Sequence, residues 1–429
     1  MIDRYSLEKM KSIWSEENKF RKWLEVELAA CEAWKTLGKI PEASLRRIKK
    51  DARFSVKRIS EIERTVDHDV IAFLTNVAEH VGPDSRFIHM GMTSSDVVDT
   101  SLSLLMKDSA HLIIADIKDL IRALKAKAKQ YKHTPMIGRS HGIHAEPTTF
   151  GLKMALYYEE MKRNLDRMTR AMEIISVGKF SGAVGTYSNI EPKVEEIACR
   201  KLGIKKAEVS TQVIQRDRHA EYLTSIAIVA ATLEKIATEI RNLQRTEIQE
   251  AEEPFKQGQK GSSAMPHKKN PITCERIAGL ARVLRANSMV SLENVALWHE
   301  RDITHSSTER IIIPDSSILI DYMLQTLTRI IDNLVVYPDN MRKNIDKTQG
   351  LIFSQRLLLM LVGKGLTRED AYKIVQSNAM KSRGRRSLKD EVLSDPVAAK
   401  HLSKKEVESA FDINYYLRHV DDIFKRINI

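Results

Sequence analysis

The chain has 429 residues, of which 42% are hydrophobic and 29% charged, with only 17 glycines and 11 prolines. This balance is that of an ordered globular protein, and it excludes a disordered or collagen-like chain. The formal net charge of +12 is spread along the sequence and aromatic residues are sparse, at 6%. A dedicated nucleic-acid binder is therefore not expected, and the charge by itself fits either a lysine-rich surface of the thermophilic kind or a positive field that attracts small anionic ligands.

The three cysteines do not form a recognisable framework. Cys31, Cys199 and Cys274 are odd in number, widely spaced and in no CxxC pair, so the sequence suggests neither disulfides nor a zinc cluster. A reducing, cytoplasmic location is expected. The longest apolar run, in "YLTSIAIVAATL", has about a dozen residues, fewer than the ~18 that span a bilayer, and we expect no membrane anchor or signal peptide.

Three long helices are predicted in chain order. Between Gly91 and Pro135 there is no glycine or proline, and apolar residues recur with helical spacing at Ile113, Ile117, Leu120 and Leu124. A second series follows, and a third has a seam that repeats every seven residues. These two series are Met154, Tyr158, Met161, Leu165, Met168, Met172 and Ile175, and Ile226, Val229, Leu233, Ile236, Ile240 and Leu243.

The third helix also carries apolar residues outside its seam, at Ile228, Ala230, Ala231 and Ala237. They predict burial on more than one face, and a helix of about 30 residues would reach roughly 45 Å. Helices of this length suit a bundle rather than a compact globule. The sequence therefore predicts an all-α fold with a long central helical bundle.

Segments rich in Gly, Pro, Ser and His separate these helices at 81–95, 133–151, 177–192 and 254–271, the last ending where another helix would begin at Pro271. Such loops are where functional sites tend to be built. After Gly350 the pattern changes to shorter helices with Lys and Arg clusters. We expect an N-terminal helical domain (1–92), a central bundle domain (93–350) and a small helical C-terminal domain (351–429).

Four histidines lie in or beside these segments, at His68, His89, His141 and His144. Histidine most easily gives and takes protons near neutral pH, so all four are candidates for acid–base chemistry. The HxxH spacing of His141 and His144 also invites a metal site. It lacks the helical HExxH frame, and no Cys or carboxylate pattern completes a ligand set, so no metal is expected.

Two further segments suit anions. In "GMTSSDVVDT", Thr93, Ser94 and Ser95 precede a long helix, where their hydroxyls would cap its first turn and backbone N–H groups could meet an anion. The stretch "GSSAMPHKKNP" is neither a Walker A loop nor a nucleophile elbow. Its two hydroxyls, glycine and Lys268 favour an anion-binding loop that holds carboxylates or stabilises an oxyanion.

Together, "GSSAMPHKKNP", "GMTSSDVVDT" and "GRSHGIHAEPTTFG" resemble the three signature regions of the fumarase/aspartase superfamily. Within it, the chain looks like the adenylosuccinate lyases over nearly its whole length. The matching stretches are "RYS", "HDVIAF", "SGAVGTYSN", "TQVIQRDRHAEYL", "RDITHSSTER" and "FDINYYLRHVDDIF".

This resemblance implies a three-domain, almost all-α homotetramer whose active sites are shared between subunits. The implied reaction is a β-elimination that releases fumarate from adenylosuccinate, giving AMP, and from the related ribotide SAICAR, giving AICAR. It needs a base for a C–H and an acid for the leaving nitrogen, but no cofactor or metal. By the resemblance Ser262 is the base and His141 the acid, and the loop closes over substrate. Lys268 stabilises negative charge, and His68 and Glu275 belong to the catalytic group.

The substrate-binding residues that the resemblance implies surround the nucleotide and the succinyl group. They are Arg4, Tyr5, Asp69, His89, Thr93, Ser94, Gln212, Ser263, Asn270, Arg301, Ser306 and Arg310. Position 67 departs from the pattern, because Asp67 stands where a basic or neutral residue is expected. This puts in doubt how that side of the pocket meets the phosphate.

Two alternatives stay open. Another lyase of the superfamily, such as an argininosuccinate lyase, a fumarase or a carboxymuconate cycloisomerase, would share the signature regions; Arg4, Tyr5, "RDITHSSTER" and the C-terminal domain favour the purine substrate. A non-catalytic helical scaffold or nucleic-acid binder would also fit the fold. The presence of Ser262, His141, His68 and Lys268 argues against it. The expected partners are therefore small succinyl nucleotides and further copies of this chain, with neither nucleic acid nor membrane.

Overall fold

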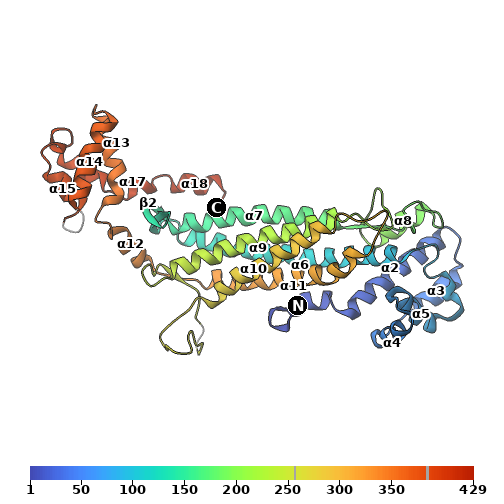
Figure 1. The fold of residues 1–429 in the computed structure, drawn as a ribbon. Helices are drawn as coiled ribbons and strands as arrows, with labels where there is room; N and C mark the ends of the chain where they lie inside the picture. Colours follow the sequence, from blue (N-terminus) through green and yellow to red (C-terminus); the bar gives the residue numbers. More distant parts are fainter. Residues whose placement is uncertain (256–257, 383–385) are drawn as a thin grey trace. The chain divides into compact units, whose positions relative to one another are not determined.

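The computed structural model describes residues 1–255, 258–382 and 386–429, and these are mostly helical, as the all-α prediction requires (Figure 1). The chain divides into two compact units. The first comprises Met1–Asp119, Lys162–Glu234 and Ile277–Thr326, and the second comprises Leu120–Met161, Lys235–Arg276 and Leu327–Ile429. The three-domain division made from the sequence stays a prediction.

Five long helices run from one unit into the other. They are α6 (Ser94–Gln130), α7 (Phe150–Ile175), α9 (Asp217–Leu243), α10 (Ile272–Glu293) and α11 (Thr304–Asp332). The three helices predicted from apolar spacing are α6, α7 and α9, and the helix expected at Pro271 is α10. All six residues of the predicted α9 seam are at most 2% exposed, which confirms that seam as core.

Polar side chains join neighbouring long helices. In the first unit, Asn164 on α7 donates to Thr232 on α9, and Tyr222 on α9 shares a hydrogen bond with Ser317 on α11. In the second unit, Lys235 of α9 pairs with a carboxylate of α7, Glu160. The helices therefore form a bundle within each unit, as predicted.

The prediction that α9 is buried on a second face is only half right for the single chain. Ala230 and Ala237 are buried, but Ile228 is 46% exposed and Ala231 is exposed too. The described part of the chain leaves these two side chains largely uncovered. Apolar spacing reports that a face is suited to burial, not which chain covers it.

Helices of 3 to 21 residues also belong to the first unit. They are η1 (Asp3–Tyr5), α1 (Glu8–Ile13), α2 (Glu16–Thr36), α3 (Glu42–Asp51), α4 (Val56–Val66), α5 (Asp69–Val81), η2 (Gly82–Phe87) and α8 (Pro192–Lys201). Their core centres on Phe20, Trp23 and Phe73, with the Phe20 and Phe73 rings stacked 5.8 Å apart. This cluster fixes α5, which begins at Asp69 and has His68 as its N-cap.

Strands are few and short in the described residues. They are β1 (Pro135–Ser140) with β2 (Ile143–Thr149), β3 (Val177–Gly178) with β4 (Lys205–Lys206), and β5 (Ala251–Glu252) with β6 (Val335–Val336). The segment 133–151, expected to be a loop, is thus largely an antiparallel hairpin. Its glycines and prolines indicated a loop, and the strands PMIGRS and IHAEPTT have no clear alternation of apolar and polar residues.

The end of the chain forms short helices of the second unit, as the change of pattern after Gly350 predicts. They are α12 (Pro338–Asp346), η3 (Leu351–Phe353), α13 (Ser354–Gly363), α14 (Arg368–Ser382), α15 (Leu388–Ser394), η4 (Ala398–Lys400), α16 (Lys404–Ala410), α17 (Asn414–Leu417) and α18 (Val420–Arg426). Leu357, Leu361 and Leu388 centre their core. No described helix is both long and apolar enough to cross a membrane.

Candidate active site

The loop between β5 and α10 is closed at its base by Glu253. The Glu253 carboxylate, 2% exposed, accepts the backbone N–H groups of Thr273 (3.2 Å) and Cys274 (2.9 Å) in the first turn of α10. The Glu253 N–H in turn donates to the side-chain oxygen of Gln244, 3.0 Å away. The N-terminus of a helix favours such a carboxylate. Both ends of the segment between Glu253 and Thr273 are therefore held in place.

Close backbone contacts shape the loop itself. Asn270 Nδ2 donates to the Gly261 carbonyl (2.8 Å), and Gln244 Nε2 donates to the Lys269 carbonyl (2.9 Å). A Cβ at Gly261 would lie 2.2 Å from the Lys268 carbonyl oxygen, which explains glycine there. Residues 256 and 257, part of the loop predicted at 254–271, lie outside the described residues.

Ser262 has a specific environment. Its Oγ accepts the backbone N–H groups of Ala264 (3.2 Å) and Met265 (3.1 Å). Two oriented donors stabilise negative charge on an oxygen, and so make the alkoxide form of this serine more accessible. Ser263 and Lys268 are exposed, so the loop presents its hydroxyl and its cation to solvent.

A cavity of about 1000 Å³ opens beside the loop, within the second unit. Three of the predicted site residues line it: Lys268, Asn270 and Glu275. Ser262 is not among its lining residues. Arg241 and Arg245, at the end of α9, line it as well. The arginines and Lys268 make the cavity suitable for an anion with several oxygens.

His141 lies at the tip of the β1–β2 hairpin. Ser140 pairs with Ile143, so His141 and Gly142 form a two-residue turn, with φ of 54° and 78°. Positive φ at both positions is the type I′ pattern that suits tight hairpins, and it is costly for a residue other than glycine. The turn leaves the His141 side chain exposed.

Buried charges anchor this hairpin. Arg139 donates two hydrogen bonds, of 2.9 and 2.7 Å, to Glu250, which is fully buried and also accepts from Asn344 Nδ2 at 2.7 Å. The pKa of nearby His144 is lowered by its partial burial and by the charge of Arg139. His144 is therefore a neutral neighbour of the anchor, and the tip histidine is held on a rigid support.

In the first unit, α5 and α11 bring three predicted residues together. His68 is the N-cap of α5, where Nδ1 accepts the N–H of Ile71, 3.4 Å away. Asp69 pairs with Arg310 at 2.6 Å. Burial opposes ionisation of Asp69, but Arg310 outweighs it and lowers the pKa of the carboxyl. Arg310 is still 55% exposed, so part of its guanidinium stays available to an anion.

Asp67, the departure noted in the sequence, has a local role. It is the C-cap of α4 and has a left-handed backbone, with φ of 52°. Aspartate tolerates this conformation better than most residues. Asp67 therefore forms the turn between α4 and α5, and its side chain is exposed.

His89 is held by a buried acid. Its Nδ1 lies 2.6 Å from Glu27 Oε1, and its backbone N–H donates to Glu27 Oε2 at 2.8 Å. Burial disfavours the charged imidazole, but the hydrogen bond and charge of Glu27 prevail and raise the pKa of His89 above 6.5. His89, whose φ is 62°, is therefore an oriented side chain that is readily protonated.

The His89–Glu27 pair makes a pH-dependent contribution to stability. Because the pKa of His89 is raised on folding, the contribution is full below about 6.5 and is lost as the pH rises through the folded value. We expect Glu27→Gln to cost about 1 to 3 kcal/mol at pH 6 and distinctly less at pH 9. Thermal unfolding of both proteins at the two pH values checks this, and an equal loss at both would contradict it.

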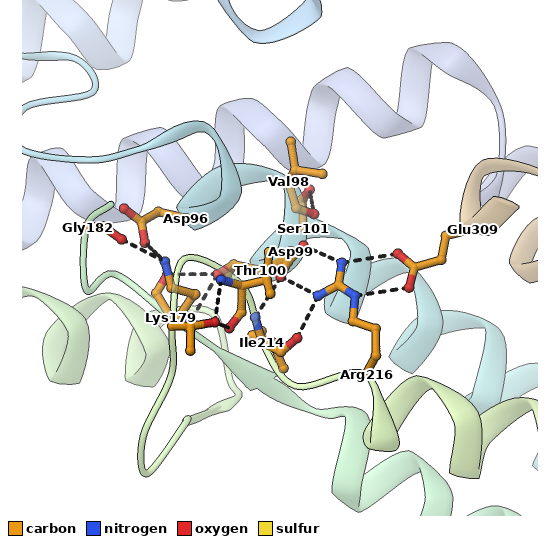
Figure 2. Close-up of polar contacts among 12 residues, drawn as sticks. Asp96, Val98, Asp99, Thr100, Ser101, Lys179, Gly182, Ile214, Arg216 and Glu309 are labelled. Carbon is orange, nitrogen blue, oxygen red and sulfur yellow. Dashed lines mark hydrogen bonds and ion pairs between the residues drawn. The ribbon is translucent and has the colours of Figure 1, made fainter. Parts of the chain in front are cut away.

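The start of α6 is held by the carboxylate of Asp96, whereas the sequence predicted that the hydroxyls of Thr93, Ser94 and Ser95 would cap this helix. The Asp96 carboxylate accepts the Thr93 N–H at 2.8 Å and pairs with Lys179, and both charged side chains are fully buried (Figure 2). The same carboxylate accepts the N–H of Ser181 at 3.1 Å. Asp96 thus fixes Thr93 and the neighbouring Ser94 against the loop at 179–182.

The other binding residues predicted in the first unit lie on three segments. Arg4 and Tyr5 form η1, and the Tyr5 ring lies 5.3 Å from that of Tyr322 on α11. Gln212 is in the loop before α9, half-buried. Arg301 and Ser306 flank the start of α11, and Arg301 Nε is buried with no hydrogen-bond partner in the described chain.

Comparison with known proteins decides the family. Residues 4–285 match the family described as lyases, and residues 350–427 match the adenylosuccinate lyase C-terminus. The chain is 53% identical over 427 residues to adenylosuccinate lyase of Thermotoga maritima, covering 99% of each. It is 51% identical over 430 residues to that of Bacillus subtilis, covering 100% of each. The chain belongs to the adenylosuccinate lyase family.

The fold of this adenylosuccinate lyase family member is shared more widely. A fumarate lyase from Mesorhizobium sp. BNC1 superposes with a TM-score of 0.91 at 26% identity, covering 100% of this chain and 99% of that one. A 3-carboxy-cis,cis-muconate lactonizing enzyme from Pseudomonas putida gives 0.90 at 26%, covering 98% and 96%. The fumarase/aspartase fold inferred from the signature regions is thereby confirmed, and the chain is a lyase.

Some residues at the candidate site of this family member were missed by sequence reasoning. Arg241, in the last turn of α9, and Arg245, just after that helix ends, line the cavity, and their spacing of four residues in the sequence was a usable signal. Asp99, Arg216 and Glu309 form a buried ion cluster next to three binding segments. All three residues lie in stretches that carried the resemblance, but the sequence around each of them does not predict that their side chains come into contact.

Proposed function

We propose that this protein cleaves adenylosuccinate to AMP and fumarate, and SAICAR to AICAR and fumarate. The supporting observation is the match along the whole chain, at more than half identity, to two adenylosuccinate lyases. Both substrates carry a ribose phosphate and a nitrogen that bears a succinyl group, so one pocket can present the same kind of C–N bond for cleavage.

In the proposed reaction Ser262 is the base and His141 the acid. The Ser262 alkoxide takes a proton from the succinyl carbon next to a carboxylate, the C–C bond becomes double, and the C–N bond breaks. His141 protonates the departing nitrogen, which leaves as the NH2 group of the nucleotide product. The N–H groups of Ala264 and Met265 support this role, because they lie against Ser262 Oγ.

The remaining catalytic residues act on charge and position. We assign Lys268 to the developing negative charge of the succinyl carboxylate, because it lines the cavity beside the loop. His68 and Glu275 complete the catalytic group. His68 is anchored as the N-cap of α5, and Glu275 lies in the first turn of α10.

The binding residues are assigned to the two anionic ends of the substrate. Arg4, Arg301 and Arg310 suit phosphate and carboxylate, since a guanidinium meets two oxygens at once. The hydroxyls and amides hold the remaining polar groups, and His89 lines the pocket. These hydroxyl and amide residues are Tyr5, Thr93, Ser94, Gln212, Ser263, Asn270 and Ser306, with Asp69 orienting Arg310.

We propose that the protein works as a homotetramer. Large apolar side chains are exposed on the described bundle helices of the first unit: Ile228 (46%), Met289 (58%), Leu292 (46%) and Ile311 (64%). Such side chains on long helices are typical of subunit interfaces. We also place the protein in the cytoplasm, because its three cysteines are free and buried, as in a reducing compartment.

The purine assignment is tested by a substrate panel. Purified protein without added metal should cleave adenylosuccinate and SAICAR, followed by the change in ultraviolet absorbance when the base loses its succinyl group. Argininosuccinate, malate and a carboxymuconate serve as controls. Activity on a control with none on either purine compound would overturn the substrate assignment but not the family, whereas inactivity on all would favour a scaffold.

A further inference from the structure

Arg216 uses every donor that it has. Its guanidinium donates to both oxygens of Asp99 (2.6 and 2.9 Å), to both oxygens of Glu309 (3.0 and 3.1 Å), and to the carbonyl of Ile214 (2.6 Å), as Figure 2 shows. Arginine has five N–H groups, so all are satisfied. Arg216, Asp99 and Glu309 are 3%, 2% and 6% exposed.

Each partner belongs to a segment that carries binding residues. Asp99 is on the second turn of α6, after Thr93 and Ser94, and it also accepts the Ile214 N–H at 2.7 Å. Arg216 follows Gln212 in the loop before α9. Glu309 stands on α11 between Ser306 and Arg310. One guanidinium therefore joins three separate parts of the chain, and none of its own atoms is left for substrate.

We propose that Arg216 is a positioning residue that sets the Gln212 loop against α6 and the start of α11, and so fixes the spacing of the substrate-binding side chains. The proposal rests on the function assigned above. It explains why a fully desolvated cation and two carboxylates are placed here, where an apolar core would pack at lower cost. The proposal also explains why an arginine is needed. Its planar guanidinium has five N–H donors, whereas the ammonium group of lysine has three and is not planar.

The two carboxylates are not equivalent. Burial opposes ionisation of Asp99, but Arg216 outweighs it, and the pKa of Asp99 falls to about 2. For Glu309, the effect of burial outweighs the charge of Arg216, and the pKa of the Glu309 carboxyl rises to about 7. Asp99 is therefore the permanent partner of Arg216, and Glu309 is the weaker link, which makes a Glu309 variant the gentler probe.

The test compares Arg216→Lys and Glu309→Gln with Arg218→Lys. Arg218 is in the same segment, but its guanidinium bonds only to the Ile174 carbonyl and Glu208 in the described chain. We expect Arg216→Lys to raise KM for adenylosuccinate roughly tenfold to a hundredfold with kcat little changed. Glu309→Gln, which keeps one acceptor for Arg216, should show a smaller rise, and Arg218→Lys none.

Hydrogen exchange gives a readout that does not depend on turnover. In Arg216→Lys, backbone amides in 211–214 and 304–310 should exchange faster than in the wild type, and in Arg218→Lys they should not. Faster exchange with an unchanged KM would overturn the positioning role, as would unchanged exchange in both segments. Wild-type protein that cleaves no purine substrate would refute the proposed function instead, and exchange alone would then decide whether Arg216 holds these segments.

If Arg216→Lys fails to fold, Glu309→Gln decides the question by the same two readouts. A KM for Glu309→Gln equal to that of Arg218→Lys, with equal exchange, would then contradict the proposal. A raised KM together with faster exchange at 304–310 would support it. Circular dichroism and thermal melting of each variant separate this outcome from a general loss of structure.

Discussion

Ser262→Ala is expected to lower kcat for adenylosuccinate by roughly 10² to 10⁴-fold and to leave substrate affinity within a few fold of the wild type. The reason is the environment of Ser262 Oγ, where two backbone N–H groups point at the one oxygen that alanine removes. Binding depends on arginines and other groups elsewhere, so the loss falls on proton transfer.

Stopped-flow or steady-state kinetics give kcat, and calorimetry on the slow variant gives the dissociation constant. Ser60→Ala is a matched control, because the Ser60 hydroxyl is exposed and, among the described residues, bonds only to the Val56 carbonyl of its own helix. Ser263→Ala is run in parallel. Near-normal turnover by Ser262→Ala would move the base elsewhere, and a large loss in Ser263→Ala alone would assign it to that neighbour.

His141→Ala should be about as inactive alone, and mixing it with Ser262→Ala under subunit exchange should restore activity. Within the second unit the two residues have separate supports. The hairpin is anchored through Arg139 and Glu250, and the loop through Gln244 and Asn270. Different subunits are therefore expected to supply them to one site.

If two subunits supply these residues, random hybrids of the two variants contain both intact residues in roughly a quarter of their sites. Activity near that fraction of the wild type is the expected result. A fluorescence or mass-spectrometric measurement must first show that subunits exchange. Demonstrated exchange without recovered activity would contradict shared sites and require both residues to act within one chain.

The sequence predicted the helices well because their signal is local. Apolar residues at helical spacing identified α6, α7 and α9, and the breaker-rich segments marked where most of them end. The exposed Ile228 shows the limit of such a pattern. Spacing indicates that a side chain is suited to burial, but the surface that covers it can belong to another chain.

The hairpin at His141 and the ion cluster at Arg216 could not be predicted from the local sequence pattern. A Gly next to His141 suggested a loop, whereas paired strands and positive φ at both residues give a tight turn. Asp99, Arg216 and Glu309 lie far apart in sequence, and their meeting depends on how α6, α11 and the loop before α9 pack. The resemblance supplied the site residues; only the structure supplies the contacts of the described ones.

The central claim, a fumarate-releasing elimination from adenylosuccinate, is tested most directly by identifying the products. Purified protein, treated with chelator, is incubated with adenylosuccinate and followed by proton nuclear magnetic resonance. The account predicts that the olefinic signal of fumarate appears with AMP in equal amounts, and that Ser262→Ala slows both together. Aspartate with IMP in place of fumarate with AMP would mean hydrolysis rather than elimination, and would contradict the account.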